Sequence, residues 1–468
     1  MNSPDSWILA LSWLDRLIEA VRSPSYNLKV IYLGVTSLGL AAGVCGCFLL
    51  FRKRSLLSDT IGHSTLPGVC IAFLLFARWG SGGKSFIALM IGALITGWLS
   101  VRAVQWIKNN SKIKEDAALA IPLTVLYGLG VVLLSVVQDS NLNLQGSSGL
   151  EYYLFGMVAS MIQAEAIMLA IVSLGALTVI SLFFKELNCL SFDEDFVASQ
   201  GLPHRWLDEV LMLTCLTVTI AGLQTVGLLM IMAAFIIPPA TARLWTDSMP
   251  WTLAIAGFVG ATGALIGAIA SAVIFRLPAG AAIILASALL FGFSMLFGSR
   301  KGWVVRQLKV ARLEKRLSEN QLLRDLFDRL EAQQKVRLLA GLDFSRDLAQ
   351  VSLPVHDILK DRGWSQRKER SVARSLSSQN LLKFERGDCV QLTTQGLERA
   401  IEVARTHRLT ELYLIEHADV APARVHQYVE KIEEITNPEI ASDIHQLFSN
   451  ELEQALIPAE PHRGGDTS

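Results

Sequence analysis

The sequence predicts an all-α polytopic membrane bundle of about eight or nine transmembrane helices, followed by a cytosolic, mainly α winged-helix domain with a helical dimerisation part. Apolar stretches of about 20 residues, the length that crosses the hydrocarbon core of a bilayer, recur through residues 1–300. Charged side chains are far denser in residues 301–468. The formal net charge of +0 therefore averages an apolar part and a solvated part, and it points to no class of partner.

The N-terminal segment, residues 1–27, is predicted to be amphipathic and to lie at the membrane interface. Ser3 to Val21 carries both apolar and polar side chains, and Ser23-Pro24 ends it with a turn. The segment has no basic start followed by a small-residue cleavage site, so it is not expected to be a signal peptide.

The transmembrane domain is predicted to cover residues 28–300, because its apolar runs are long enough to cross a membrane. The expected spans are 28–51, 65–79, 86–107, 117–137, 163–184, 206–231, 252–275 and 279–298. A shorter apolar piece, 232–245, is broken by Pro238-Pro239. Basic clusters such as Arg52–Arg54 mark the cytosolic side by the positive-inside rule. The C-terminal part is then cytosolic only if 232–245 crosses, which makes nine crossings; a re-entrant piece would make eight.

Two ionisable residues, Asp59 and His63, interrupt this apolar region. Ionisable side chains are costly inside a membrane, which makes them candidates for a functional site. Their i, i+4 spacing places them on one face of a helix. Imidazole and carboxylate together suit divalent zinc, manganese or ferrous iron. The alternative is that Asp59 caps a helix and His63 simply packs.

A polar segment between the fifth and sixth spans, residues 192–202, is predicted to form a short helix. Its acidic start, Asp193-Glu194-Asp195, suits a helix N-terminus. Gly201 would end the helix, since glycine readily takes the left-handed conformation found there. Small residues at Ala198 and Gly201 would let another protein surface approach, although an ordinary acidic loop remains the alternative.

The soluble part is predicted to comprise a charged, solvated helical linker over 301–334, a compact domain over 335–450 and a disordered tail over 451–468. Leu376–Leu382 followed by residues 383–392 predicts a helix running into a two-stranded wing. The preceding helix carries basic side chains that could contact DNA phosphates, or that could serve solubility alone. These residues are Arg367, Lys368, Arg370 and Arg374.

Potential metal ligands follow the wing. His407 and Glu411 are spaced i, i+4, and a second group shares one face of the next helix. That second group consists of His426, Glu430, Glu433 and Glu434. Such side chains could bind manganese or ferrous iron, or could form an ordinary solvated helix face. The six cysteines are scattered and are expected to be small buried hydrophobes rather than zinc ligands.

The membrane part resembles the permease subunits of ABC transporters that import zinc, manganese or iron (the ABC-3 type). Matching motifs occur in the order typical of that family. They include Leu57 to His63, Leu66-Pro67-Gly68, Glu115-Asp116-Ala117, Tyr153 to Gly156, residues 192–202 and Gly227 to Ala242. The resemblance implies that Asp59 and His63 lie on the metal path. It also implies that a coupling helix seats on a separate ATPase. The residues of that helix are Asp193, Glu194, Asp195, Phe196, Ala198 and Gly201.

Residues 364–448 resemble the metal-responsive repressors of the diphtheria toxin repressor and manganese repressor family. The resemblance implies one metal site at His407, Glu411 and His426 and a second at Glu430 and Glu433. Glu434 stands where the family usually has histidine. The family's N-terminal acidic or Met ligand has two candidates here, Asp325 and Asp328.

The expected function is therefore that of a bacterial inner-membrane permease for divalent metal with a fused cytosolic metal-sensing domain. Divalent manganese, iron or zinc would be its substrate and the effector of that domain. The expected partners are an ATPase subunit, a solute-binding protein, a second permease subunit, the lipid bilayer and DNA. The chain has no Gly-x-x-x-x-Gly-Lys-Ser/Thr phosphate loop, so it is not expected to be an enzyme itself. A membrane-tethered, metal-dependent transcription regulator is the alternative.

Overall fold

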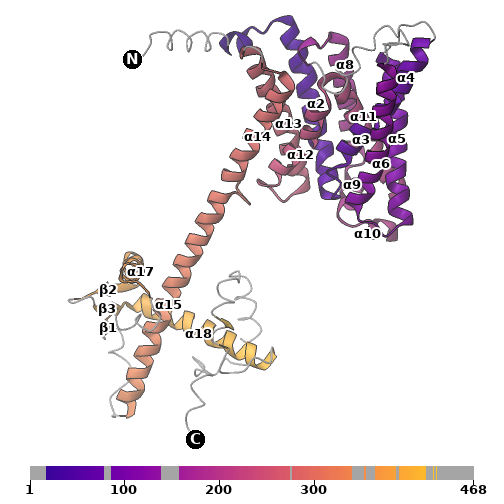
Figure 1. Ribbon diagram of the computed structural model, residues 1–468. Coiled ribbons are helices and arrows are strands. Elements are labelled where there is room, and N and C mark those ends of the chain that lie inside the picture. Colours follow the sequence, from indigo (N-terminus) through magenta and orange to yellow (C-terminus); the bar gives the residue numbers. More distant parts are fainter. Residues whose placement is uncertain are drawn as a thin grey trace, which may run out of the picture. The chain divides into compact units, whose positions relative to one another are not determined.

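The computed structural model describes residues 17–78, 86–138, 158–274, 277–339, 353–354, 364–385, 389–417, 425 and 428–429. The chain forms two compact units, Met1–Arg306 and Gln307–Ser468, and each is described by itself (Figure 1). Most of the expected N-terminal segment, the whole expected tail and the ligand candidates His426, Glu430, Glu433 and Glu434 lie outside the described residues.

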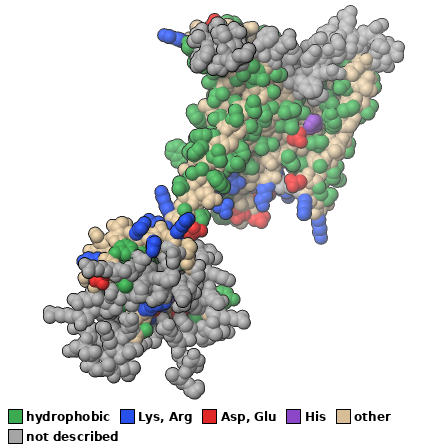
Figure 2. Space-filling view, turned by 60° about the vertical axis from the view of Figure 1, so that its left-hand side comes forward, with side chains coloured by type: hydrophobic (Ala, Val, Ile, Leu, Met, Phe, Trp, Pro, Cys, Tyr) green, Lys and Arg blue, Asp and Glu red, His purple; other side chains and the backbone are tan. Residues whose placement is uncertain are grey.

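The first unit is the expected helical bundle, and its described part contains eight helical segments long and apolar enough to cross a membrane. Its elements are α2 (Tyr26–Phe51), α3 (Leu57–Ser64), α4 (Leu66–Arg78), α5 (Phe86–Asn110), α6 (Glu115–Val137), η3 (Val158–Ser160), α8 (Gln163–Leu182), α9 (Phe184–Phe192), α10 (Glu194–Ser199), α11 (His204–Val226), α12 (Leu228–Ala242), α13 (Met249–Val273) and α14 (Ala279–Phe297). Apolar side chains cover the sides of this unit, while basic and acidic side chains gather at one end (Figure 2).

Two expected boundaries are wrong. The span expected at 65–79 begins at Leu57, because α3 and α4 together form one crossing, Leu57–Phe76. Asp59 and His63 therefore lie within a spanning segment and not before it. The span expected at 206–231 ends at Val226, because Gly227 adopts φ +95° and interrupts the helix. That backbone conformation is accessible to glycine and strained for other residues.

Pro238 and Pro239 do not break the chain as expected but lie inside α12. A proline has no amide hydrogen, so Pro239 leaves the carbonyl of Phe235 without its usual helical donor. Gly46 of α2 packs directly on that carbonyl, and a side chain at position 46 would overlap it. A membrane helix tolerates proline where a neighbouring helix covers the freed backbone group.

Helix α12 brings the chain back to the end of the bundle at which α2 ends. The carbonyl of Leu244, just beyond α12, accepts hydrogen bonds of 3.2 Å from the amides of Arg300 and Lys301, just beyond α14. The guanidinium of Arg243 lies 5.4 Å from the ring centroid of Phe51, the last residue of α2. Helix α11 therefore leaves this end and α12 returns to it, although α12 is shorter than the eight candidate spans of the described residues.

Helices α2 and α13 pack closely in the core of the bundle. A methyl group on Gly39 would overlap the carbonyl oxygen of Gly260, and one on Gly43 would overlap that of Ala256. Small residues allow the two backbones to approach this closely. The resulting van der Waals contacts stabilise the helix pair, since there is no hydrophobic driving force between helices in lipid. The glycines of these two helices therefore form packing surfaces.

The second unit contains a winged-helix arrangement. Its described elements are α15 (Trp303–Leu339), β1 (Leu353–Pro354), α17 (Gln366–Ser378), β2 (Leu382–Phe384), β3 (Cys389–Leu392) and α18 (Thr394–His417). The antiparallel sheet has the order β1-β3-β2, with Leu382 opposite Leu392. The β2–β3 pair is the predicted wing, and β1 is a third strand that the sequence did not indicate.

Helix α15 is more than a solvated linker. Its Leu322, Leu326 and Leu330 are buried in the core of the second unit, together with Leu376 of α17 and Ala404 of α18. The expected linker, 301–334, is thus helical, but its second half packs as part of the domain. The leucines at a spacing of four indicate a buried helix face, but the many charged residues between them led to the prediction of a solvated linker.

Candidate metal path, coupling segment and regulatory site

Asp59 and His63 lie on one face of α3, as their spacing predicted. His63 Nε2 is 3.3 Å from Asp59 Oδ1, and each side chain is roughly a quarter exposed, at 27% and 28%. The ring of Tyr127 on α6 meets the imidazole edge-on, with the ring centroids 4.8 Å apart. This ring contact fixes the orientation of the imidazole in the bundle.

One polar atom of each of these two side chains has no hydrogen bond to the described part of the protein. Asp59 Oδ1 and His63 Nδ1 are buried and have no hydrogen-bond partner among the described residues. The 3.3 Å approach of Asp59 to His63 is close enough for an ion pair but lacks hydrogen-bond geometry. Unsatisfied polar atoms are costly in a membrane interior, and imidazole nitrogen and carboxylate oxygen are both atoms that divalent cations accept as ligands.

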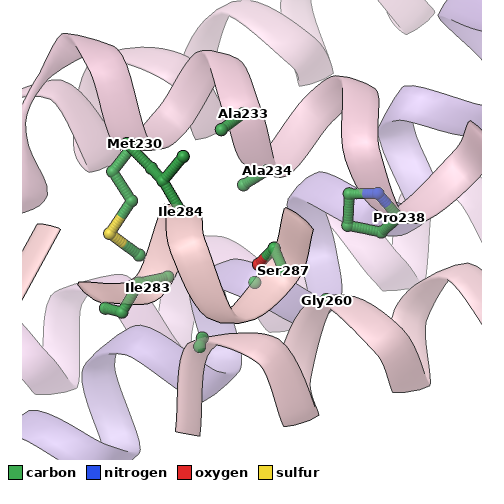
Figure 3. A pocket seen from close by; sticks show the side chains of 10 residues that line it. Met230, Ala233, Ala234, Pro238, Gly260, Ile283, Ile284 and Ser287 are labelled. Carbon is green, nitrogen blue, oxygen red and sulfur yellow. The ribbon is translucent and has the colours of Figure 1, made fainter. Parts of the chain in front are cut away.

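The described residues contain no group of three or more His, Cys, Asp or Glu side chains placed to hold a metal ion. Two ligands with free coordination positions suit an ion that must enter and leave, whereas a structural site is closed by four. The cavity shown in Figure 3 offers no comparable set of ligands. It lies among α2, α12, α13 and α14, and Ser287 is the only lining side chain with an oxygen or nitrogen donor.

The expected coupling segment forms the short helix α10. Asp193 caps it, since its carboxylate accepts a 2.9 Å hydrogen bond from the amide of Phe196. Gly201 ends the segment in a left-handed conformation with φ +73°, as predicted, and a side chain there would meet open space. Glu194 and Asp195 occupy the first turn, where the helix dipole favours negative charge.

Exposed aromatic and aliphatic side chains surround α10. They are Phe192, Phe196, Leu202 and Trp206, and each is at least 39% exposed. Val197, in contrast, is fully buried and anchors the helix to the bundle. An anchored helix bordered by exposed apolar side chains has the character of a protein-docking surface.

An ionic cluster connects α10 with the ends of α2 and α11. Arg54 donates hydrogen bonds of 2.9 and 3.1 Å to the two carboxylate oxygens of Asp208. Arg52 lies 3.1 Å from Asp208 and 3.3 Å from Glu194 of α10. The amide of Leu57, the first residue of α3, bonds the carbonyl of Arg54 at 2.9 Å. Helix α10 and the helix that carries Asp59 are thus joined through four consecutive contacts.

In the second unit, His407 and Glu411 lie together on α18, with His407 Nε2 3.2 Å from Glu411 Oε1. Both are buried, and Arg324 of α15 lies against the imidazole. The adjacent Arg408 binds Asp328 at 2.8 Å and Glu331 at 2.7 Å. Burial lowers the pKa of Arg408, but the hydrogen bonds and charges of Glu331 and Asp328 outweigh this effect and raise it. Asp328, one candidate for the N-terminal ligand, is therefore engaged by an arginine.

The four basic residues proposed to contact DNA are all exposed on α17. Lys368 lies 4.5 Å from the ring centroid of Trp364, and Val372, Ala373 and Leu376 bury the opposite side of the helix. The exposure of Arg367, Lys368, Arg370 and Arg374 is compatible with phosphate contacts, and DNA binding stays a prediction.

Several residues of these sites were missed in the sequence. Asp208 lies in a predicted span and could have been found, because an ionisable residue in a span needs a partner. Gln224 could have been found in a similar way, since it is a polar residue in a predicted span, although an uncharged side chain is a weaker signal. Both of its amide atoms are buried and have no partner among the described residues. Tyr127 and Arg324 carried no signal, because only the packing of α6 on α3 and of α15 on α18 brings them into place.

Comparison with known proteins agrees with this architecture. Residues 25–298 match the model of the ABC 3 transport family, and residues 393–452 match the iron dependent repressor, metal binding and dimerisation domain. The manganese transport system membrane protein MntC of Bacillus subtilis is 32% identical over 403 residues, covering 84% of this chain and 86% of its own. That aligned length exceeds the family match, so the similarity continues beyond the membrane unit.

Two further relatives cover the membrane unit. The zinc transport system membrane protein TroC of Treponema pallidum is 32% identical over 59% of this chain and 91% of its own. The structure of PsaBC from Streptococcus pneumoniae in complex with Fab aligns with a TM-score of 0.53 and 29% identity, over 63% of this chain and 99% of that one.

Proposed function

Because the chain belongs to the ABC 3 transport family, we propose that it is the membrane-spanning permease subunit of an importer whose cargo passes Asp59 and His63 as a divalent metal ion. The observation that carries this proposal is the pair of buried, unsatisfied donor atoms on one face of α3. Imidazole nitrogen and carboxylate oxygen suit manganese, ferrous iron and zinc. Manganese is the first cargo to test, because a relative that is 32% identical over 84% of the chain is a manganese transport protein.

The contacts around α3 suggest how movement would reach the metal. Leu228, the first residue after the break at Gly227, packs on Gly62, between Asp59 and His63. Helix α11 joins this break to the ionic cluster beside α10. A shift of α10 would therefore be transmitted through α11 to the break and to the helix with the ligands. Hinges of this kind are a few residues at helix ends that absorb the change in backbone angles.

The energy would come from a separate ATPase subunit seated on α10 and its exposed apolar border. A solute-binding protein would deliver the metal at the opposite end of the bundle, and a second permease subunit would complete the pathway. The end carrying Arg52, Arg54, Arg243 and Lys301 would face the cytosol by the positive-inside rule. The second unit, which follows α14 at that end, would then be cytosolic and regulatory.

The proposal is tested by measuring the manganese, zinc and iron content of cells with and without this chain. Loss of the chain should lower the content of one metal, and its expression from a plasmid should restore it. Unchanged content of all three metals under metal limitation would contradict the proposal.

A further inference from the structure

The second unit contains a buried cation at the position where the repressor resemblance expects a metal ion. Arg324 Nη1 of α15 lies 2.7 Å from His407 Nδ1 and 3.0 Å from His407 Nε2. His407 in turn lies 3.2 Å from Glu411. Arg324 is 4% exposed, His407 3% and Glu411 0%, so solvent is excluded from all three.

The charges and donors of this cluster are complementary without a metal. If the Nε2 hydrogen of His407 faces Glu411, the lone pair on Nδ1 accepts from the guanidinium, and both contacts are satisfied by one tautomer. Arginine keeps its positive charge at any physiological pH and offers only donors. The imidazole of His407 therefore contacts a guanidinium and a carboxylate of opposite charge.

A divalent ion does not fit this arrangement. It would have to bind the same nitrogen and oxygen atoms, at about 2.0–2.2 Å, while Arg324 stays a few ångströms away. Two cations at that separation repel strongly where solvent is excluded. Metal entry would then require the removal of a buried arginine from its partners, which leaves an uncompensated charge.

We infer that Arg324 is a tethered cation that takes the place of a divalent metal ion beside His407 and Glu411. The pair of helices α15 and α18 is thereby held in one arrangement without an effector. A second contact of the same kind supports this arrangement, because Arg408 of α18 binds Asp328 and Glu331 of α15. This inference concerns the second unit alone and does not rest on the proposed transport activity.

The test counts the Mn²⁺ ions bound per full-length chain, purified in detergent, by equilibrium dialysis and elemental analysis. Arg324→Gln removes the charge while keeping most of the length of the side chain, and it should gain one Mn²⁺ ion relative to the wild type. Arg324→Lys keeps a cation and should gain none. Arg324→Gln combined with His407→Ala should lose the gain. The inference is overturned if Arg324→Gln gains nothing, or if the gain survives without His407.

A single substitution keeps the inference testable even if the Arg324 variants do not fold. His407→Ala in an otherwise wild-type chain should leave the number of bound Mn²⁺ ions unchanged. Loss of one ion in that variant would show that His407 already holds a metal in the presence of Arg324, and it would overturn the inference. Arg316→Met serves as the matched control, since Arg316 is an exposed arginine of the same helix.

Discussion

Arg54 and Asp208 form a buried ion pair at the end of the bundle where α10 lies, with the two residues only 4% and 8% exposed. Asp208 also accepts from Arg52, so one carboxylate serves two guanidiniums. A buried charge that loses its partner costs far more free energy than an exposed one. The pair therefore determines how α2, α11 and the start of α3 meet.

Asp208→Ala should lower the free energy of unfolding by about 3–5 kcal/mol, because it leaves two buried guanidiniums without their shared carboxylate. Thermal unfolding of the detergent-purified protein measures the loss. The neighbouring Glu209 is the matched control, since its partner Arg102 is half-exposed. Glu209→Ala should cost less than about 1 kcal/mol. Equal losses in the two variants would mean that burial of the Arg54–Asp208 pair has no energetic weight.

At the scale of elements, the long apolar runs predicted the spans well, because length and hydropathy alone decide which helices can cross a membrane. The errors arose at α3 and α12. Asp59 and His63 lowered the apolar character of α3, and the prolines of α12 suggested a break. Helix α12 is continuous because Gly46 of α2 packs on the carbonyl that Pro239 leaves free, and α3 is helical although Asp59 and His63 keep buried atoms without a partner among the described residues. The sequence of one segment does not contain that information. Likewise, the charges of α15 concealed the leucines that pack into the second unit.

Helix α10 is the element on which coupling is expected to depend. Gly201→Trp should abolish metal-stimulated ATP hydrolysis by the assembled transporter, because an indole at an open position beside α10 would hold the ATPase surface away. The left-handed backbone at Gly201 adds a strain of about 1–2 kcal/mol for any residue with a side chain. Gly201→Asn carries the smallest such strain without the bulk, and it should retain most of the activity. Normal hydrolysis and transport in the Trp variant would contradict the proposal that the ATPase subunit docks on α10.

At the scale of the whole molecule, the chain joins a permease of the ABC 3 transport family to a domain of the iron dependent repressor type. The two parts use similar ligand chemistry in opposite ways. In the bundle, Asp59 and His63 leave donor atoms unsatisfied, which suits an ion in transit. In the second unit, Arg324 lies against His407, which in turn lies beside Glu411, and such a set of contacts suits a fixed structure.

The most direct test of the account is ATP-driven manganese uptake by proteoliposomes that contain this chain with its ATPase and solute-binding partners. Asp59→Ala and His63→Phe should each reduce uptake by at least about tenfold. Loss of a residue that only supports a metal ligand already costs about that much in affinity or activity, and these variants remove a proposed ligand itself. His63→Phe retains a ring against Tyr127, so a loss of uptake would report the missing nitrogen donors. Thr60→Val on the same helix should transport normally. Wild-type uptake by both ligand variants, with normal assembly, would contradict passage of the metal along α3.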